Sequence, residues 1–213
     1  ESLDVDTKDG LNDTELGAVV NRSMARVEYI RGLEFDRTVP VEVISREEFR
    51  TRMLNNRSNL TDDQRLHQEI KFEATFMVGE NESAIQQRES NTGSTVLGAY
   101  SPKNDTIVLV SEDDENPNVN EITFSQELFH ALQQPRHNAS SHTQNTEERH
   151  NAKDGIVEGD ANYVEQLYEQ RCEGEWNCLD EFERTDGGSD QRPQTHLGML
   201  ALRLQPYSDG PVF

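Results

Sequence analysis

An excess of acidic side chains sets the conditions under which this chain can fold. Its 213 residues include 41 Asp and Glu but only 20 Lys and Arg, which gives a formal net charge of -21. In dilute buffer a charge of this size repels itself and destabilises the compact state. At molar salt the Debye length shrinks to roughly 3 Å, so the repulsion is screened and the carboxylates mainly keep the surface hydrated. The composition therefore favours a protein of a halophile.

Such a chain could instead be disordered, because low hydrophobicity and high net charge are also typical of disorder. Against this alternative, the apolar residues fall into periodic blocks, which favours a folded domain. Nucleic acid is a poor partner for this surface, since the sequence has no basic patch to neutralise phosphates. No apolar run approaches the ~20 residues of a membrane-spanning helix, so we expect no transmembrane segment.

Two features favour an extracellular or cell-surface location. Cys172 and Cys178 bracket a short loop and can close a small disulfide, a bond typical of oxidising compartments. The N-glycosylation pattern N-x-S/T also recurs along the chain. Its acceptors, each a candidate for an N-glycan, are Asn12, Asn21, Asn56, Asn59, Asn81, Asn104 and Asn138. We therefore expect a secreted or cell-surface glycoprotein.

The periodicity of apolar residues predicts an α+β fold in a single domain, residues 1–213, with a small sheet and several helices. Asp13 is expected to cap the first helix and Asn120 the helix that follows the sheet. The predicted strands are 39–44, 96–100 and 106–110, of which the last two form a hairpin. The predicted helices are 13–32, 46–78 with a break at 55–63, 121–133, 154–170 and 196–204.

The predicted helix at 121–133 contains a pattern that could carry chemistry. On a helix, Gln126 and His130 share one face a turn apart, with Glu127 beside them. Zinc hydrolases use this geometry in H-E-x-x-H, where two histidines coordinate the metal and the glutamate activates its water. Here Gln126 stands at the first histidine position. Glu158, near the start of the next predicted helix, stands where a third ligand would lie.

The strings Gln-Glu-Leu-Phe-His-Ala-Leu-Gln at 126–133 and Val-Glu-Gly-Asp-Ala at 157–161 resemble two blocks of a known family. They are similar to the H-E-L-x-H-A-L-Q and E-G-D-A blocks of a zincin-like family common among haloarchaeal surface proteins. The strand at 39–44, the Gly-Ala-Tyr of the hairpin and the terminal Pro-Tyr-Ser-Asp-Gly also resemble that family. In such proteins the pattern continues past the last block, so the resemblance implies a C-terminally incomplete chain.

The resemblance implies a zincin-like fold in which a small sheet lies beside an active-site helix and a glutamate-bearing helix. It also implies roles by position: Glu127 as general base, His130 as second zinc ligand and Glu158 as third. The first ligand falls on Gln126, whose neutral carbonyl oxygen is a weak donor for zinc and suits calcium or magnesium better. Loop histidines between the two helices could replace it: His137, His142 and His150.

Two functions of different classes follow from this site. The first is a degenerate, non-hydrolytic metallopeptidase domain, a pseudoenzyme that serves as a structural or recognition module and contacts cell-envelope or surface-layer components. The second is an active metal-dependent peptidase, in which Glu127 acts as general base on a peptide substrate and zinc is the cofactor. Its oxyanion stabiliser would come from His142, His150, Tyr163 or Tyr207. The residue that separates the two hypotheses is Gln126.

Overall fold

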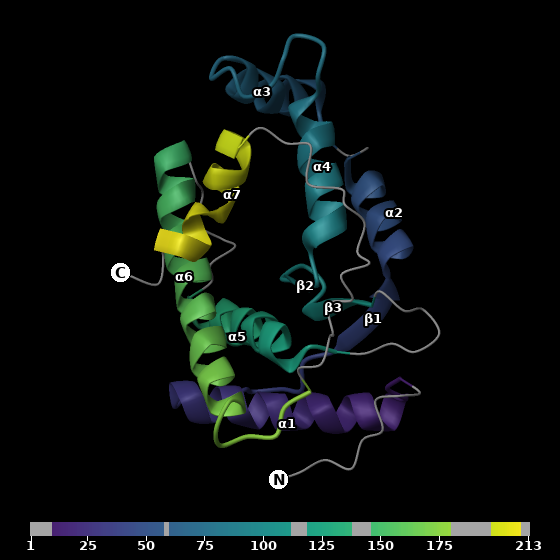
Figure 1. Cartoon of the computed structure of the whole chain (residues 1–213), viewed down its shortest axis with the longest axis vertical. Helices are drawn as coiled ribbons and strands as arrows, with labels where there is room; N and C mark the ends of the chain where they lie inside the picture. The colour runs from purple at the N-terminus through teal and green to yellow at the C-terminus, as the bar shows by residue number, and fades with distance from the viewer. Residues whose placement is uncertain (1–9, 58–59, 112–118, 138–145, 180–196, 210–213) are drawn as a thin grey trace.

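The computed structural model describes residues 10–57, 60–111, 119–137, 146–179 and 197–209. These residues form helices and a small sheet in the order shown in Figure 1. The helices are α1 (Asp13–Arg31), α2 (Arg46–Arg57), α3 (Asp62–Glu73), α4 (Ala84–Thr95), α5 (Glu121–His137), α6 (Glu147–Cys172) and α7 (Leu197–Asp209). The strands are β1 (Val41–Ser45), β2 (Gly98–Ser101) and β3 (Thr106–Ser111). The fold is α+β, as the sequence predicts.

The three strands pair in the order β1-β3-β2, so β3 is central and β2 is an edge strand. β1 runs parallel to β3, whereas β2 and β3 form the predicted antiparallel hairpin, with Gly98 opposite Leu109. Because parallel strands need a long crossover, helices α2, α3 and α4 lie in the connection from β1 to the hairpin. The central strand supplies the buried side chains Ile107 and Leu109.

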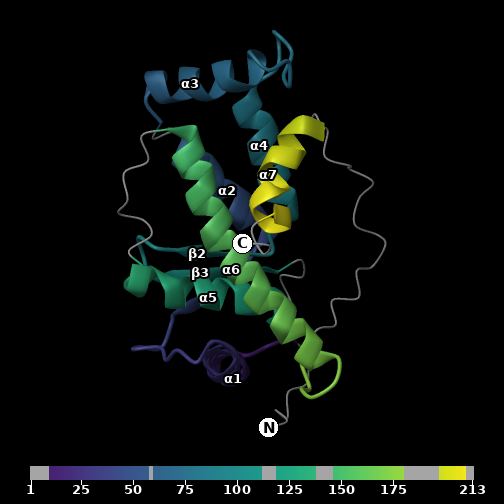
Figure 2. The same ribbon diagram turned by 90° about the vertical axis from the view of Figure 1, so that its left-hand side faces the viewer.

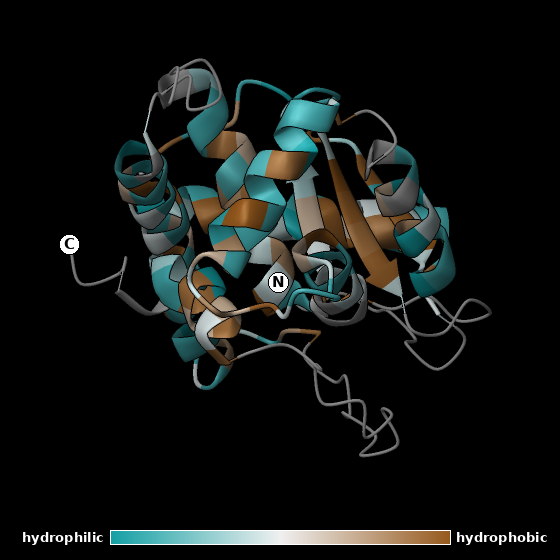
Figure 3. Cartoon of the chain, turned by 90° about the horizontal axis from the view of Figure 1, so that it is seen from above, coloured by the Kyte–Doolittle hydropathy of each residue, from teal (hydrophilic) through white to brown (hydrophobic). Residues whose placement is uncertain are grey.

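Helix α5 is the centre of the main core. It lies between the sheet and α1 in both side views (Figures 1 and 2) and crosses α6. Four large side chains of α5 are almost fully buried there: Phe124, Leu128, Phe129 and Leu132. The same helix also buries polar side chains, among them Glu121, Gln126 and Glu127, so α5 is enclosed on most sides. Seen from above, the strands carry hydrophobic residues while the outer helical turns are mainly hydrophilic (Figure 3).

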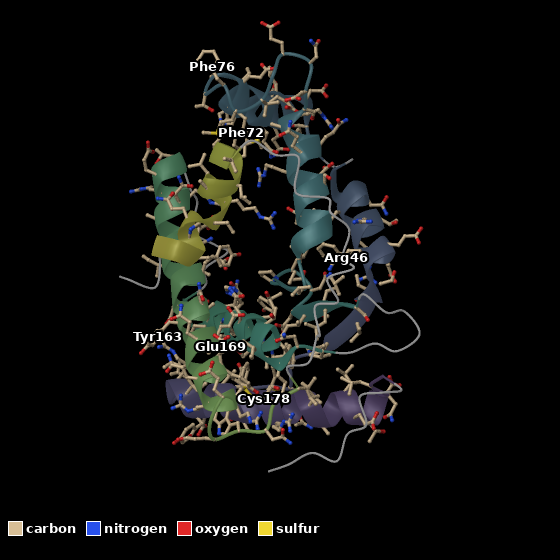
Figure 4. All side chains as sticks on the ribbon, in the orientation of Figure 1. Arg46, Phe72, Phe76, Tyr163, Glu169 and Cys178 are labelled. Atoms are coloured by element: carbon tan, nitrogen blue, oxygen red, sulfur yellow. A yellow bond between two sulfur atoms is a disulfide. The ribbon has the colours of Figure 1, made fainter. Side chains whose placement is uncertain are left out.

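A second, smaller core joins α3, α4 and α7 at the far end of the molecule. It contains Phe72, Val78, Ala84 and Met199. Figure 4 shows Phe72 at this end, beside α7. Met199 belongs to α7, so this small cluster fixes one end of α7, while the other end packs against α6.

The first predicted helix is confirmed, but its cap differs from the prediction. Asn12, rather than Asp13, is the N-cap: its side chain accepts hydrogen bonds from the backbone N–H groups of Thr14 and Glu15. The Glu15 carboxylate in turn accepts from the Asn12 N–H, which completes a capping box. Asn120 caps α5 as predicted, because its side-chain Oδ1 accepts hydrogen bonds from the backbone N–H groups of Ile122 and Thr123.

Helix α4 is absent from the sequence prediction. Its segment is polar, with Ile85 as its only large aliphatic residue, so it shows no apolar stripe. Instead, its N-terminus is fixed by its neighbours. Ser83 caps the Gln86 N–H, and the Glu69 carboxylate of α3 accepts hydrogen bonds from Ser83 Oγ and the Ala84 N–H. Tertiary capping of this kind leaves no local pattern in the sequence.

The last three helices are longer than predicted. α5 continues through Pro135 to His137, α6 begins two turns early behind the N-cap Thr146, and α7 continues through Pro206. The predicted disulfide is confirmed, since Cys172 and Cys178 are bonded. In the part of the chain that the structure describes, no helix has both the length and the apolar character needed to cross a membrane.

The glycan acceptors fall in different settings. Asn12, Asn21, Asn81 and Asn104 are exposed, and Asn56 lies near the end of α2. Asn59 and Asn138 lie outside the described residues.

Candidate functional site

Glu127 lies at the junction of α5 and the edge strand β2. Its carboxylate Oε2 accepts a hydrogen bond of 2.7 Å from the backbone N–H of Tyr100. The side chain passes directly over Gly98, where an added Cβ would lie 3.2 Å from Glu127 Cγ and 3.2 Å from Leu109 Cδ2. A contact that tight would force the neighbours apart. Glycine at position 98 therefore makes room for the Glu127 carboxylate beside the strand.

His130 lies one turn further along α5, with a partner at each ring nitrogen. Its Nε2 is 3.3 Å from Glu158 Oε2, and its Nδ1 is 3.3 Å from Gln133 Oε1. The amide of Gln133 is oriented by its own contacts, because Gln133 Nε2 donates to the Val157 carbonyl and to Asp160. Both acceptors facing the ring are oxygens, so this geometry suits an imidazole that carries a proton on each nitrogen.

A second ion pair holds this arrangement against α1. Arg31 donates to the carboxylate of Asp160, with an N–O distance of 2.8 Å, and its guanidinium lies 5.0 Å from the centre of the Phe129 ring. The imidazole of His130 is thus connected through Gln133 and Asp160 to a side chain of α1. Such outer contacts fix the ring orientation of a functional histidine.

The three candidate residues shift one another's pKa. Burial raises the pKa of Glu127, although His130 and the Tyr100 N–H oppose the shift. Burial alone would lower the pKa of His130, but the carboxylates of Glu158 and Glu127 outweigh it, so the net pKa is raised. For Glu158, the contact with His130 outweighs burial and lowers the pKa. The site therefore favours a charged His130–Glu158 pair.

Tyr207, on α7, completes the site from the opposite side. Its hydroxyl hydrogen-bonds the Glu158 carboxylate, and its backbone carbonyl accepts a 2.7 Å hydrogen bond from Asn162 of α6. Burial and the nearby Glu158 raise the pKa of Tyr207, so its hydroxyl remains a donor at neutral pH.

These side chains line a cavity of about 480 Å³ that is bordered by β2 and by helices α2, α4, α5, α6 and α7. Its lining includes Glu127, His130, Glu158 and Tyr207, together with the basic side chains Lys153 and Arg203. Apolar walls come from Phe49, Met53, Val96 and Val157. A concave, largely apolar pocket with a few convergent polar groups is the usual form of a ligand site.

Gln126 takes no part in this lining. It is 9% exposed and lies on α5 one turn before His130, but it is not among the described residues that border the cavity. Within the described ranges, no group of three His, Cys, Asp or Glu side chains is placed to hold a metal ion. Among the described residues, His130 and Glu158 thus supply two of the three protein ligands that a catalytic zinc uses.

Of the proposed replacement ligands, His150 does not reach the cavity. His150 is exposed on α6, where it pairs with Asp154 at 3.2 Å, and it is not among the described residues around the cavity. His137 is the last residue of α5, and His142 lies outside the described residues. Of the candidate oxyanion stabilisers that are described, Tyr207 borders the cavity, whereas Tyr163 is 45% exposed on α6 and His150 lies elsewhere.

Several residues of the site are not identified by the sequence analysis: Gly98, Tyr100, Gln133 and Asp160. Gln133 and Asp160 belong to the two strings that carry the family resemblance, and their spacing from His130 and Glu158 was an available signal. In the structure they hydrogen-bond each other across the α5–α6 contact. The contribution of Tyr100 is a backbone N–H, which no side-chain pattern reveals.

Comparison with protein-family models, with curated proteins and with solved structures gives no match for this chain. The structure itself shows an α+β protein with a cavity that is lined by Glu127, His130 and Glu158.

Proposed function

We propose that this chain is a zincin-like domain of a cell-surface or secreted glycoprotein of a halophilic archaeon, and that its former metallopeptidase site is a non-hydrolytic recognition site. One observation carries the proposal: both ring nitrogens of His130 already have protein partners, Glu158 and Gln133. The cavity beside them is large enough for a small ligand or for one or two side chains of a partner.

The chemistry of the pair opposes metal binding. Zinc needs a neutral imidazole nitrogen, so it competes with protons for His130. The carboxylates of Glu158 and Glu127 stabilise that proton and raise the pKa of His130. Zinc would also have to displace the histidine from Glu158. Gln126, a weak amide donor, does not border the cavity, so it supplies little binding energy to offset these costs.

The assignment to the cell surface has independent support. The disulfide between Cys172 and Cys178 suits an oxidising compartment. Four sequon asparagines have exposed side chains, as glycan attachment requires: Asn12, Asn21, Asn81 and Asn104. The partners of such a domain would be cell-envelope or surface-layer components.

Zinc titration of variants at position 126 tests the proposal. The wild-type protein is expected to bind zinc weakly, and Gln126→His is expected to bind it more tightly by orders of magnitude, because a third ligand is restored. Gln126→Leu is the matched control, since it changes the same buried position without supplying a donor. If the wild type bound zinc as tightly as Gln126→His, the site would not be degenerate.

The alternative function is a working metal-dependent peptidase. It is favoured by the fact that Glu127, His130, Glu158 and Tyr207 all border one cavity. In this alternative Glu127 takes the proton of the attacking water, and the Tyr207 hydroxyl lies near the place where negative charge would develop. A peptidase activity that is lost in Glu127→Gln but kept in Glu42→Gln, the same change at an exposed carboxylate that does not border the cavity, would support it; no activity above background in the wild type would oppose it.

A further inference from the structure

A second cavity lies at the far end of the molecule, where α3, α4 and α6 converge. Its volume is about 560 Å³. Most of its wall is one face of α3, with Arg88 contributed by α4 and His150 by α6. The side view in Figure 2 shows the start of α6 below α3. This cavity shares no described lining residue with the one around Glu127.

The charge of this cavity is opposite to that of the whole chain. Its described lining includes two permanent cations, Lys71 and Arg88, and two histidines, His67 and His150, but a single carboxylate, Asp63. In the whole sequence the acidic residues outnumber the basic ones, 41 to 20. On a protein this acidic, a surface that serves only to hold water would carry mainly carboxylates. The surplus of cations in this cavity therefore favours a binding role.

The spacing along α3 explains how the donors converge. Asp63, Gln64, His67, Gln68, Lys71 and Phe72 recur at helical intervals and share one face. Of these, Gln64, His67, Gln68 and Lys71 carry N–H groups that can donate hydrogen bonds. The Phe72 ring, which is 7% exposed, lines the cavity and belongs to the small core, so it anchors this face of α3.

We propose that this cavity binds a small anion that carries a phosphate or sulfate group. Its tetrahedral oxygens accept hydrogen bonds, and the donors here are two amides, two imidazoles, an ammonium and a guanidinium. The Nε2 of His150 also lies 3.2 Å from Asp154, so a bound anion would share this imidazole with Asp154. At molar salt the repulsion from distant carboxylates is screened beyond roughly 3 Å, so that direct contacts decide the affinity.

Calorimetric titration with inorganic pyrophosphate and with sulfate, at constant high ionic strength, tests the site. We expect saturable binding with one ligand per chain. The double variant Lys71→Gln/Arg88→Gln should weaken it by about a hundredfold, since each lost charge-assisted hydrogen bond is worth about a factor of ten. Binding of both probes would point to the tetrahedral oxyanion itself, and binding of pyrophosphate alone to a phosphate ligand.

The matched control is Arg65→Gln/Lys103→Gln, which removes the same charge outside the cavity. Arg65 lies on α3 and Lys103 in the β2–β3 turn, and neither borders the cavity. An equal loss of affinity in both double variants would mean a non-specific charge effect and would overturn the proposal. Absence of saturable binding to the wild type would overturn it as well. Should the first variant lose helical circular dichroism, His67→Ala replaces it, with an expected loss of about tenfold; unchanged affinity in that variant would contradict the assignment.

Discussion

Replacement of Glu121 by alanine should lower the free energy of unfolding more than replacement of any exposed Asp or Glu by alanine. Glu121 is the first residue of α5 and is fully buried. Its two oxygens accept hydrogen bonds from both neighbouring helices and from the residue that follows the disulfide-closed loop. The donors are Arg22, Ser23 and Arg26 on α1, the Tyr168 hydroxyl on α6 and the backbone N–H of Leu179.

The size of the effect follows from what Glu121→Ala leaves behind. The side chains of Arg22 and Arg26 are only 9% and 10% exposed, so two guanidinium groups would lose their buried counter-ion. Breaking a buried pair in this way costs about 3–5 kcal/mol. For a domain of this size, each kcal/mol shifts Tm by about 2–4 °C, so Tm should fall by about 6–20 °C.

Thermal and urea denaturation at one fixed, high salt concentration measure this loss. Glu42→Ala is the control, because the Glu42–Arg52 pair is 45% and 40% exposed and is worth at most about 1 kcal/mol. The reasoning would be refuted if Glu121→Ala remained within 1 kcal/mol of wild type, or if the two variants lost the same stability.

Three further perturbations have defined outcomes. Burial raises the pKa of Glu165 from 4.5 to about 7, and the neighbouring carboxylates of Glu169 and Glu127 add to the shift. The folded state therefore keeps this proton to a higher pH than the unfolded state, so the protein loses stability as the pH rises from 4.5 through 7. Glu165→Gln should therefore stabilise the protein by about 1–3 kcal/mol at pH 8 and leave it unchanged at pH 4, as urea titration at both values will show. Gly98→Ala should destabilise by about 1–3 kcal/mol through its tight contact with Glu127, measured by the same titration, and a neutral result would mean that the strand moves freely. Mutation of both Cys172 and Cys178 to serine should cost roughly 2 kcal/mol, and reductant should lower the Tm of the wild type but not of the variant.

The sequence identifies those elements that carry their own periodic pattern. The α1 stripe, the hairpin turn and the Asn120 cap are local features, so their residues suffice to predict them. Helix α4 could not be predicted in this way, because it has no apolar stripe and because Glu69 of another helix shares the capping of its N-terminus with Ser83. The length of α6 was underestimated because its first two turns are polar and are set by Thr146.

The candidate site was predictable in part. The i,i+4 spacing predicts that residues 126 and 130 share a face, and the structure brings Glu127, His130 and Glu158 to one cavity. What the spacing could not predict is that His130 is shared between Glu158 and Gln133, because that contact depends on how α5 crosses α6. Nor could it predict the packing of Tyr207 against Glu158, since α7 is distant in sequence.

The most direct test of the central claim, a site without catalytic zinc, is the metal content of protein purified in high salt, compared with Glu158→Ala. We expect substoichiometric zinc in both proteins and helical circular dichroism that is unchanged between them. Zinc at one equivalent in the wild type, lost in Glu158→Ala, would contradict it and would mean that another side chain completes the ligand set.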